Sequence, residues 1–184
     1  MTAEKTDEQL LSDFLTGERA ALAELALRYE PRLLGLALGL LAGQRDLACD
    51  AIQETWLRVI RFGNQFAGRS SFKTWVYRIA VNQCRSLQTL RAAGETTDPP
   101  PAKHATDAGP ARAAEAADQN HAVRQAVERL DADKRLVILL CYHTGMTHEQ
   151  AAEILELPLG TLKSRLHAAL TELRAALSAA EATS

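Results

Sequence analysis

The chain of 184 residues lacks the features that mark disulfide-rich and metal-binding proteins. Its three cysteines, Cys49, Cys84 and Cys141, are odd in number and form no CxxC pair, so neither a disulfide framework nor a zinc ribbon is indicated. Cys141 and His143 form an isolated C-x-H pair, which is too little to predict a metal site. Aromatic residues make up only 5% of the chain and β-branched residues are few, which favours helices over sheets.

Long hydrophobic runs and a basic, apolar start are also absent. The first thirteen residues are acidic and polar, unlike a signal peptide. The most apolar window, residues 33–42, contains two glycines and is far too short to span a bilayer. No Ser/His/Asp, metal-ligand or Gly-rich phosphate pattern stands out, so we predict neither an enzyme nor a bound metal or cofactor. We expect a cytoplasmic protein without membrane insertion that is monomeric on its own.

Proline is sparse except in one segment, which divides the chain. Four of the six prolines lie between residues 94 and 117, where the sequence reads GETTDPPPAKHATDAGPARAAEAA. The three consecutive prolines at 99–101 favour an extended, polyproline-like path. We therefore predict a flexible linker over residues 94–117, between one domain at residues 1–93 and another at residues 118–178.

The first domain contains three stretches in which apolar residues recur three and four positions apart, as in amphipathic helices. These predicted helices cover residues 18–41, 46–62 and 72–90. Pro31 predicts a break or a kink near Glu30 in the first of them. In the last, Trp75 falls on the apolar stripe and Tyr77 lies off it, so we expect Trp75 in the core and Tyr77 at the surface.

The second domain is also helical by its pattern, and its end reads as a helix-turn-helix. The predicted helices cover residues 114–130, 133–143, 147–155 and 160–177. Thr147 and Gln150 fit a capping box at the start of the third helix. A tight connection at residues 156–158 leads into the last helix, where Leu162 should face the core and Lys163 should point outward. On pattern alone, a plain helical hairpin in a bundle is the alternative.

The net charge of −2 argues at first against nucleic acid, but the charge is unevenly distributed. Residues 31–93 carry nine basic and three acidic side chains. Phosphate contacts are local, so a basic stretch inside an acidic chain can still bind DNA. A solvated helical surface would show the same charges, and charge alone does not separate these two interpretations.

Three stretches of the sequence resemble the sigma-70 family of bacterial RNA polymerase sigma factors. LPLGTLKSRLHAALTELR is similar to the DNA-reading helix of sigma region 4, and DAIQETWLRVIR is similar to region 2.2. FAGRSSFKTWVYRIAVNQCRSL is similar to regions 2.3 and 2.4. The likeness covers about residues 10–92 and 118–178, and the absence of other sigma domains is typical of the extracytoplasmic-function (ECF) group.

This resemblance implies an all-α fold with two small helical domains, a sigma region 2 bundle and a region 4 helix-turn-helix, joined by the flexible linker. It implies a specificity subunit rather than an enzyme. Such a subunit binds core RNA polymerase through the β′ clamp helices and the β flap, and it directs initiation from promoter DNA. Members of this group are commonly controlled by an anti-sigma factor, which we expect as a further partner.

The resemblance also assigns roles to three sets of residues. The set for the minus-ten promoter element is Phe66, Arg69, Ser70, Ser71, Lys73, Tyr77, Arg78, Asn82 and Arg85. The set for the minus-35 element is Thr161, Lys163, Ser164, Arg165 and His167. The set for polymerase docking is Asp50, Gln53, Glu54, Leu57 and Arg58. The structural alternatives are that Phe66 and Phe72 act as hydrophobic staples, that Ser70 caps a helix, and that the docking set is an ordinary solvated surface.

Three departures from the family pattern limit the resemblance, and one of them is Ala168, where the recognition helix often has an Arg. After Asn82 only Arg85 and Arg91 are basic, where the family usually carries a string of arginines, so double-strand affinity near the minus-ten element should be weak. Glu156 stands where the turn often has Gly, which is tolerated if its φ stays negative and costs about 1 kcal/mol otherwise. The remaining alternatives are a free-standing helix-turn-helix regulator and a sigma mimic that binds an anti-sigma factor without reading promoters.

Overall fold

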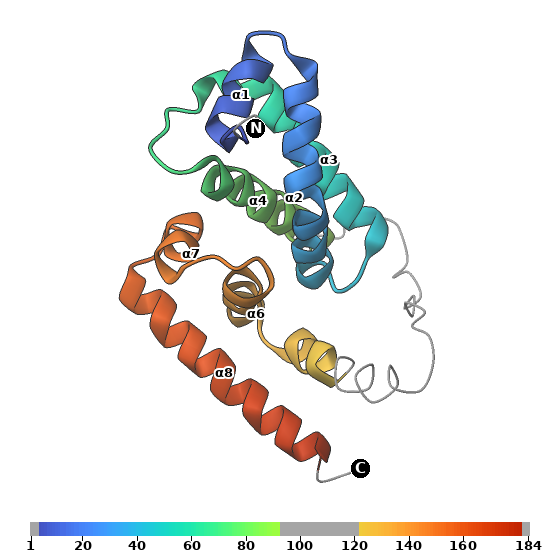
Figure 1. Ribbon diagram of the computed structural model, residues 1–184. Coiled ribbons are helices and arrows are strands. Elements are labelled where there is room, and N and C mark those ends of the chain that lie inside the picture. The colour runs from blue at the N-terminus through green and yellow to red at the C-terminus, as the bar shows by residue number, and fades with distance from the viewer. Residues whose placement is uncertain (1–3, 93–121, 182–184) are drawn as a thin grey trace. The chain divides into compact units, whose positions relative to one another are not determined.

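The computed structural model describes residues 4–92 and 122–181, and within these ranges every regular element is a helix. The chain forms two compact units (Figure 1). Helices α1 to α4, coloured blue to green, belong to the first unit, and α6, most of α7 and α8 belong to the second. The predicted linker at residues 94–117 lies outside the described residues. None of the helices in the described ranges is long and apolar enough to cross a membrane.

The first unit begins with α1 (Asp7–Leu15), a helix that the apolar periodicity does not predict. Thr6 closes its N-terminus with a capping box: the Thr6 Oγ1 accepts from the Gln9 N–H at 3.2 Å, and the Gln9 Oε1 accepts from the Thr6 N–H at 2.9 Å. The helix buries Leu10 and Leu11. The pattern Thr-x-x-Gln directly before two leucines is the sequence signal for α1. The residues around it are mostly polar, so they show no apolar periodicity that would predict a helix.

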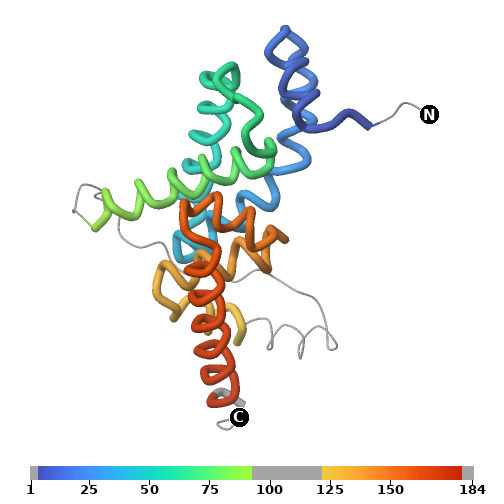
Figure 2. The backbone as a smooth tube through the Cα atoms, turned by 90° about the vertical axis from the view of Figure 1, so that its left-hand side faces the viewer, coloured from blue at the N-terminus to red at the C-terminus, as the bar shows by residue number. Residues whose placement is uncertain are grey.

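Three further helices complete the first unit and confirm the three predicted stretches. They are α2 (Arg19–Leu40), α3 (Arg45–Phe62) and α4 (Phe72–Ala92). Both views of the backbone show α4 crossing α2 and α3 (Figures 1 and 2). Of the break or kink predicted near Glu30, the break is wrong, because α2 continues through Pro31. Tyr29 and Leu33 on either side of Pro31 are both buried, and this packing outweighs the one backbone bond that proline removes.

Five aromatic side chains form a cluster around the start of α4. The aromatic cluster consists of Tyr29, Phe66, Phe72, Trp75 and Tyr77. Neighbouring ring centroids lie 5.3 to 6.4 Å apart in edge-to-face or tilted arrangements, which are the favourable geometries for aromatic pairs. Phe72 and Tyr77 are both 0% exposed, whereas Phe66 and Trp75 lie half-buried at the margin.

The burial of Tyr77 corrects the prediction for α4. We expected Tyr77 at the surface and Trp75 in the core, but Tyr77 is fully buried and Trp75 is only half-buried. The buried face of α4 is rotated from the stripe drawn through its most apolar residues, because α4 contacts three helices, α1, α2 and α3. A single apolar stripe predicts the buried residues correctly when a helix packs against one partner, and less well when it packs against three.

The described part of the second unit begins with a helix at residue 122. Residues 122–129 form one helix. They are followed by α6 (Ala132–Ile138), a π-helical turn (Leu139–His143), α7 (His148–Leu155) and α8 (Leu159–Glu181). The predicted capping box before α7 is confirmed: the Gln150 N–H donates to the Thr147 Oγ1 at 3.2 Å, and the Thr147 N–H donates to the Gln150 Oε1 at 3.0 Å.

Among the described residues, each unit contains one helix end at which a residue other than glycine adopts a left-handed conformation. Glu156 follows α7 with a φ of 55°, and the Leu157 N–H donates to the Ala152 carbonyl at 2.9 Å. Ala42 follows α2 with a φ of 53°, and the Gly43 N–H donates to the Leu38 carbonyl at 2.8 Å. Both ends have the backbone pattern that usually places glycine at this position. The condition of a negative φ at Glu156 is therefore not met.

Candidate nucleic-acid interface

The N-terminus of α4 is capped by Ser71. The Ser71 Oγ accepts from the Thr74 N–H at 3.1 Å and lies 2.9 Å from the Thr74 Oγ1. The alternative in which Ser70 is the cap is therefore wrong by one residue. Phe72 is fully buried, as expected for a structural residue. These contacts fix the point at which the preceding loop, residues 66–71, joins the helix.

The 66–71 loop presents a cation and a hydroxyl beside partly exposed aromatic rings. Gly68 has a φ of +64°, a conformation that side chains rarely adopt. Arg69 is exposed and Ser70 is half-buried. Phe66 packs on Trp75 with a centroid separation of 5.3 Å, so the loop begins on the aromatic cluster. A charged group, a hydrogen-bonding group and aromatic surface are the components that hold an unstacked base.

Basic and polar residues continue from the loop along α4. Burial lowers the pKa of Lys73, and the positive charge of Arg32 lowers it further. A phosphate beside Lys73 would relieve both effects, because it would favour the charged ammonium. Arg78, Asn82 and Arg85 follow at helical spacing on one face, and Asn82 and Arg85 are exposed. Tyr77 cannot contact DNA in this conformation, because its side chain is buried in the core.

Helix α8 separates a buried face from an exposed one, as the sequence predicts. Leu162, Leu166 and Ala169 are buried. Lys163, Ser164 and His167 are all exposed on the opposite face. The first turns of α8 therefore place a cation, a hydroxyl and an imidazole together, where a recognition helix meets base edges and phosphates.

The other two predicted residues of α8 lie at the flanks of this exposed face. Arg165 is half-buried, and its Nη1 lies 2.9 Å from the Asp133 Oδ2, next to the start of α6. Thr161 is half-buried, and its carbonyl accepts from the Ser164 Oγ at 2.9 Å. The structure thus brings Lys163, Ser164 and His167 into one surface and gives Arg165 an ion pair within its own unit.

The residues predicted for docking form a ridge along α3. Asp50, Gln53 and Arg58 are exposed, and the Arg58 Nε lies 3.2 Å from the Glu54 Oε1. Gln53 and Leu57 line two grooves, one shared with α2 and one shared with α4. The first groove also contains Leu34, Ile52 and Trp56, whereas Gln83 and Leu87 contribute to the second. A polar ridge beside apolar grooves is suited to contact with another protein.

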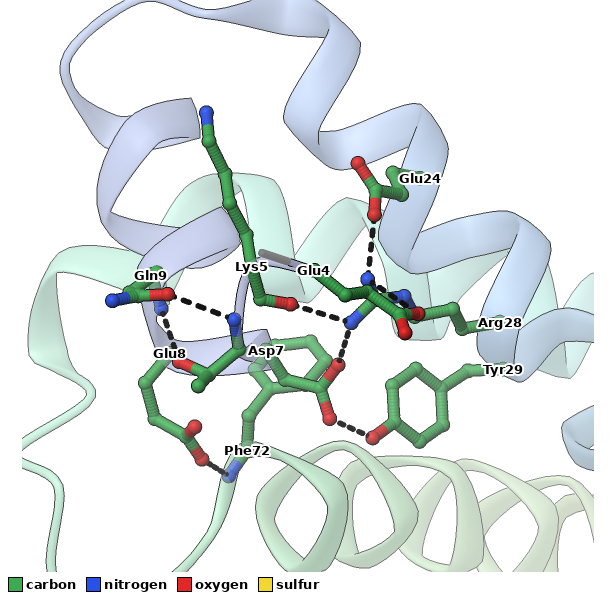
Figure 3. Close-up of polar contacts among 10 residues, drawn as sticks. Glu4, Lys5, Asp7, Glu8, Gln9, Glu24, Arg28, Tyr29 and Phe72 are labelled. Atoms are coloured by element: carbon green, nitrogen blue, oxygen red, sulfur yellow. Dashed lines mark hydrogen bonds and ion pairs between the residues drawn. The ribbon is translucent and has the colours of Figure 1, made fainter. Parts of the chain in front are cut away.

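Sequence reasoning missed two acidic residues of α1, Asp7 and Glu8, which contact α2 and the start of α4. The Glu8 Oε1 accepts from the Phe72 N–H at 2.9 Å (Figure 3). The neighbouring Asp7 accepts from the Arg28 Nη1 at 2.8 Å and from the Tyr29 hydroxyl. Nothing in the spacing of acidic residues indicates such contacts, because the partners lie more than twenty residues away. Within residues 4–92 and 122–181, no group of three or more His, Cys, Asp and Glu side chains could hold a metal ion.

Two family models match this chain. The model of sigma-70 region 2 matches residues 25–93, which include the α3 ridge, the 66–71 loop and α4. The model of sigma-70 region 4 matches residues 120–173, which include α6, α7 and the exposed face of α8. The surfaces described above therefore lie inside the matched segments, whereas Glu8 and the rest of α1 lie before the first of them.

Curated proteins and solved structures are similar over most of the chain. The RNA polymerase sigma-H factor of Pseudomonas aeruginosa is 28% identical over 176 residues, 90% of this chain and 91% of that protein. The ECF RNA polymerase sigma-E factor of Escherichia coli shows the same identity and coverage. The structure of CnrH in complex with the cytosolic domain of CnrY has a TM-score of 0.71 at 24% identity, covering 95% and 99% of the two chains. The sigma factor RpoE of Bartonella quintana, in complex with the anti-sigma factor NepR, has a TM-score of 0.67 at 25% identity, covering 85% and 96%.

Proposed function

This chain belongs to the sigma-70 family, in its ECF group, and we propose that it directs core RNA polymerase to promoters by reading two DNA elements with its two helical units. The observation that carries the proposal is that each segment matched by a region model holds an exposed polar surface suited to DNA: the 66–71 loop with α4 in the first, and the outer face of α8 in the second. The role is one of recognition and positioning rather than of covalent chemistry.

The first unit captures the minus-ten element at the 66–71 loop. Extruding a base costs a few kcal/mol of stacking, which the protein must offset through new contacts. Phe66 and Trp75 supply aromatic surface, while Arg69 and Ser70 supply hydrogen bonds. Lys73, Arg78 and Arg85 contact phosphates, and Asn82 contacts a base. Ser71 supports the site as the cap of α4, and Tyr77 supports it from the core.

The second unit reads the minus-35 element with the exposed face of α8. Lys163, Ser164 and His167 enter the major groove, where a good side-chain pair to a base edge contributes about 1–3 kcal/mol of discrimination. Thr161 and Arg165 flank this face and contact the DNA backbone. To contact the DNA backbone, Arg165 must leave Asp133 and bind a phosphate. Breaking the Arg165–Asp133 ion pair costs little free energy, because both side chains are partly exposed.

The α3 ridge docks the first unit on the β′ clamp helices of polymerase, and the second unit docks on the β flap. Asp50, Gln53 and Arg58 provide the polar contacts, while Leu57 fills the space between the two grooves. An anti-sigma factor regulates the chain by covering the same surfaces. The relative from Bartonella quintana, which was solved with an anti-sigma factor, supports this last part.

Association with core polymerase, followed by run-off transcription on genomic templates, tests the proposal. We expect the full chain to bind the core enzyme and to start transcripts at discrete positions, which reveals the promoter. Leu57→Ala should weaken core binding about tenfold, as a buried interface contact would. Leu90→Ala is the matched control, because Leu90 is 42% exposed and lies outside the proposed surface. Failure of the wild-type chain to bind core polymerase at any salt concentration would contradict the proposal.

A further inference from the structure

Helix α1 contacts the chain at both ends of the 66–71 loop. Gly63 begins the short 3-10 helix (Gly63–Gln65) that leads into the loop, and a Cβ added there would lie 3.3 Å from side-chain carbons of Leu11 and Leu15. At the other end, the Phe72 N–H donates to the Glu8 Oε1 at 2.9 Å. One face of a single helix therefore holds the residues before and after the loop.

The bond from Phe72 to Glu8 supplies a hydrogen-bond acceptor at the N-terminus of α4. Phe72 is the first residue of that helix, so its N–H has no acceptor within the helix. Ser71 accepts from the Thr74 N–H and leaves the Phe72 N–H to Glu8. A carboxylate at this position also interacts favourably with the positive end of the helix dipole.

Glu8 is itself held in place through its neighbour Asp7. Asp7 accepts from the Arg28 guanidinium and the Tyr29 hydroxyl, both on α2 (Figure 3). Arg28 also donates to the Lys5 carbonyl at 3.0 Å and contacts the Glu24 carboxylate. The ring of Tyr29 packs on Phe72 with a centroid distance of 5.6 Å. The start of α1 is thus attached to α2, and through Glu8 it is attached to α4.

We propose that Glu8 is a positioning residue for minus-ten DNA, because it holds the end of the 66–71 loop while Leu11 and Leu15 hold its beginning. Glu8 acts through the Phe72 backbone and needs no contact with DNA. The inference rests on the proposed function, since it concerns the same loop. It assigns to α1, which lies before the segment matched by the region 2 model, a part in promoter opening.

Three variants of the full chain test this role. Glu8→Ala removes the acceptor, whereas Glu8→Gln keeps an oxygen that can accept from the Phe72 N–H. Gln9→Ala is the matched control: it opens the capping box of the same helix and leaves the Glu8 contact intact. Each variant is combined with core polymerase and assayed for core binding. Transcription is then measured from the promoter that the wild-type chain uses, as a closed duplex and with its minus-ten segment already unpaired by mismatches.

We expect Glu8→Ala to lower transcription from the closed duplex about tenfold, in line with the loss of a helix cap. Core binding and transcription from the unpaired template should change less than about threefold, because neither requires the loop to extrude a base. Glu8→Gln should restore most of the activity. Hydrogen exchange of the Phe72 amide should accelerate in Glu8→Ala and stay unchanged in Gln9→Ala.

Two results overturn the inference and leave the proposed function standing. One is a Glu8→Ala variant that transcribes the closed duplex as well as the wild type does. The other is an equal loss in core binding and on both templates, which shows that Glu8 only stabilises the fold. If the wild-type chain starts no transcripts with core polymerase, the proposed function fails and this inference fails with it.

Discussion

The two proposed DNA surfaces are built in different ways. The face of α8 is a regular helix surface, whose exposed residues depend only on the burial of Leu162 and Leu166 on the other side. The 66–71 loop depends on contacts from distant parts of the chain, through Glu8, Gly63 and the aromatic cluster. A regular helix can be read from spacing, whereas an irregular loop is shaped by whatever holds its two ends.

The largest effect should come from removing the ring on which the loop depends. We expect Phe72→Ala to destabilise the first unit by about 3–5 kcal/mol, because Phe72 is fully buried and its ring contacts three others. The second unit should keep its stability. Hydrogen exchange resolved by residue measures both units in one sample. Phe62→Ala is the control, since Phe62 is 42% exposed, and an equal loss in both variants would show that burial does not set the effect.

Alkaline pH should destabilise the first unit through two buried groups on α4, Cys84 and Tyr77. Burial raises the pKa of Cys84 to about 12 from 9.0 and that of Tyr77 to about 12 from 10.0. The neutral forms are favoured in the folded unit, so their contribution to stability is complete below pH 9. It is lost as the pH rises towards about 12, at about 1.4 kcal/mol per pH unit for each group.

Denaturation followed between pH 8 and 11 checks this expectation. The first unit should lose stability above about pH 9. In Cys84→Ala the loss should begin about one pH unit higher, because the unfolded pKa of Tyr77 is 10.0 and that of Cys84 is 9.0. Tyr77→Phe should reduce the slope above pH 10. It also removes a buried hydroxyl that has no hydrogen-bond partner among the described residues. A first unit with constant stability up to pH 11 would contradict the burial of both groups.

The α8 surface should respond to single substitutions in a simpler way than the loop does. We expect Lys163→Ala to weaken promoter binding by the polymerase complex about tenfold and to lower the salt dependence by about one ion. Arg174→Ala is the matched control, because Arg174 is exposed farther along the same helix. Equal effects of the two substitutions would show that only the total charge of α8 matters.

The sequence predicted the regular helices better than the contacts that shape the 66–71 loop. Spacing predicted α2, α3, α4 and the exposed residues of α8, because each of these patterns is local. It failed at Tyr77, whose burial depends on three packing partners, and in allowing a break near Pro31, because α2 continues through this residue. It missed Glu8, because the partner of Glu8 lies 64 residues away, and it missed α1 because a short capping box among polar residues was its main local signal. The roles of the DNA-binding and docking residues stay predictions until the polymerase complex is assayed.

The smallest effects concern the two left-handed helix ends, one in each unit. A residue other than glycine in the left-handed conformation destabilises the fold by about 1–2 kcal/mol, a strain that glycine removes. Glycine also raises the entropy of the unfolded chain, which offsets about 0.4–1 kcal/mol of that gain. We therefore expect Ala42→Gly and Glu156→Gly each to stabilise its own unit by about 0.5–1 kcal/mol. Denaturant midpoints resolved by unit measure the gain, with Ala92→Gly as a control that should give none. Because Glu156 lies between α7 and α8, an unchanged affinity of Glu156→Gly for promoter DNA would show that the turn sets stability and not recognition.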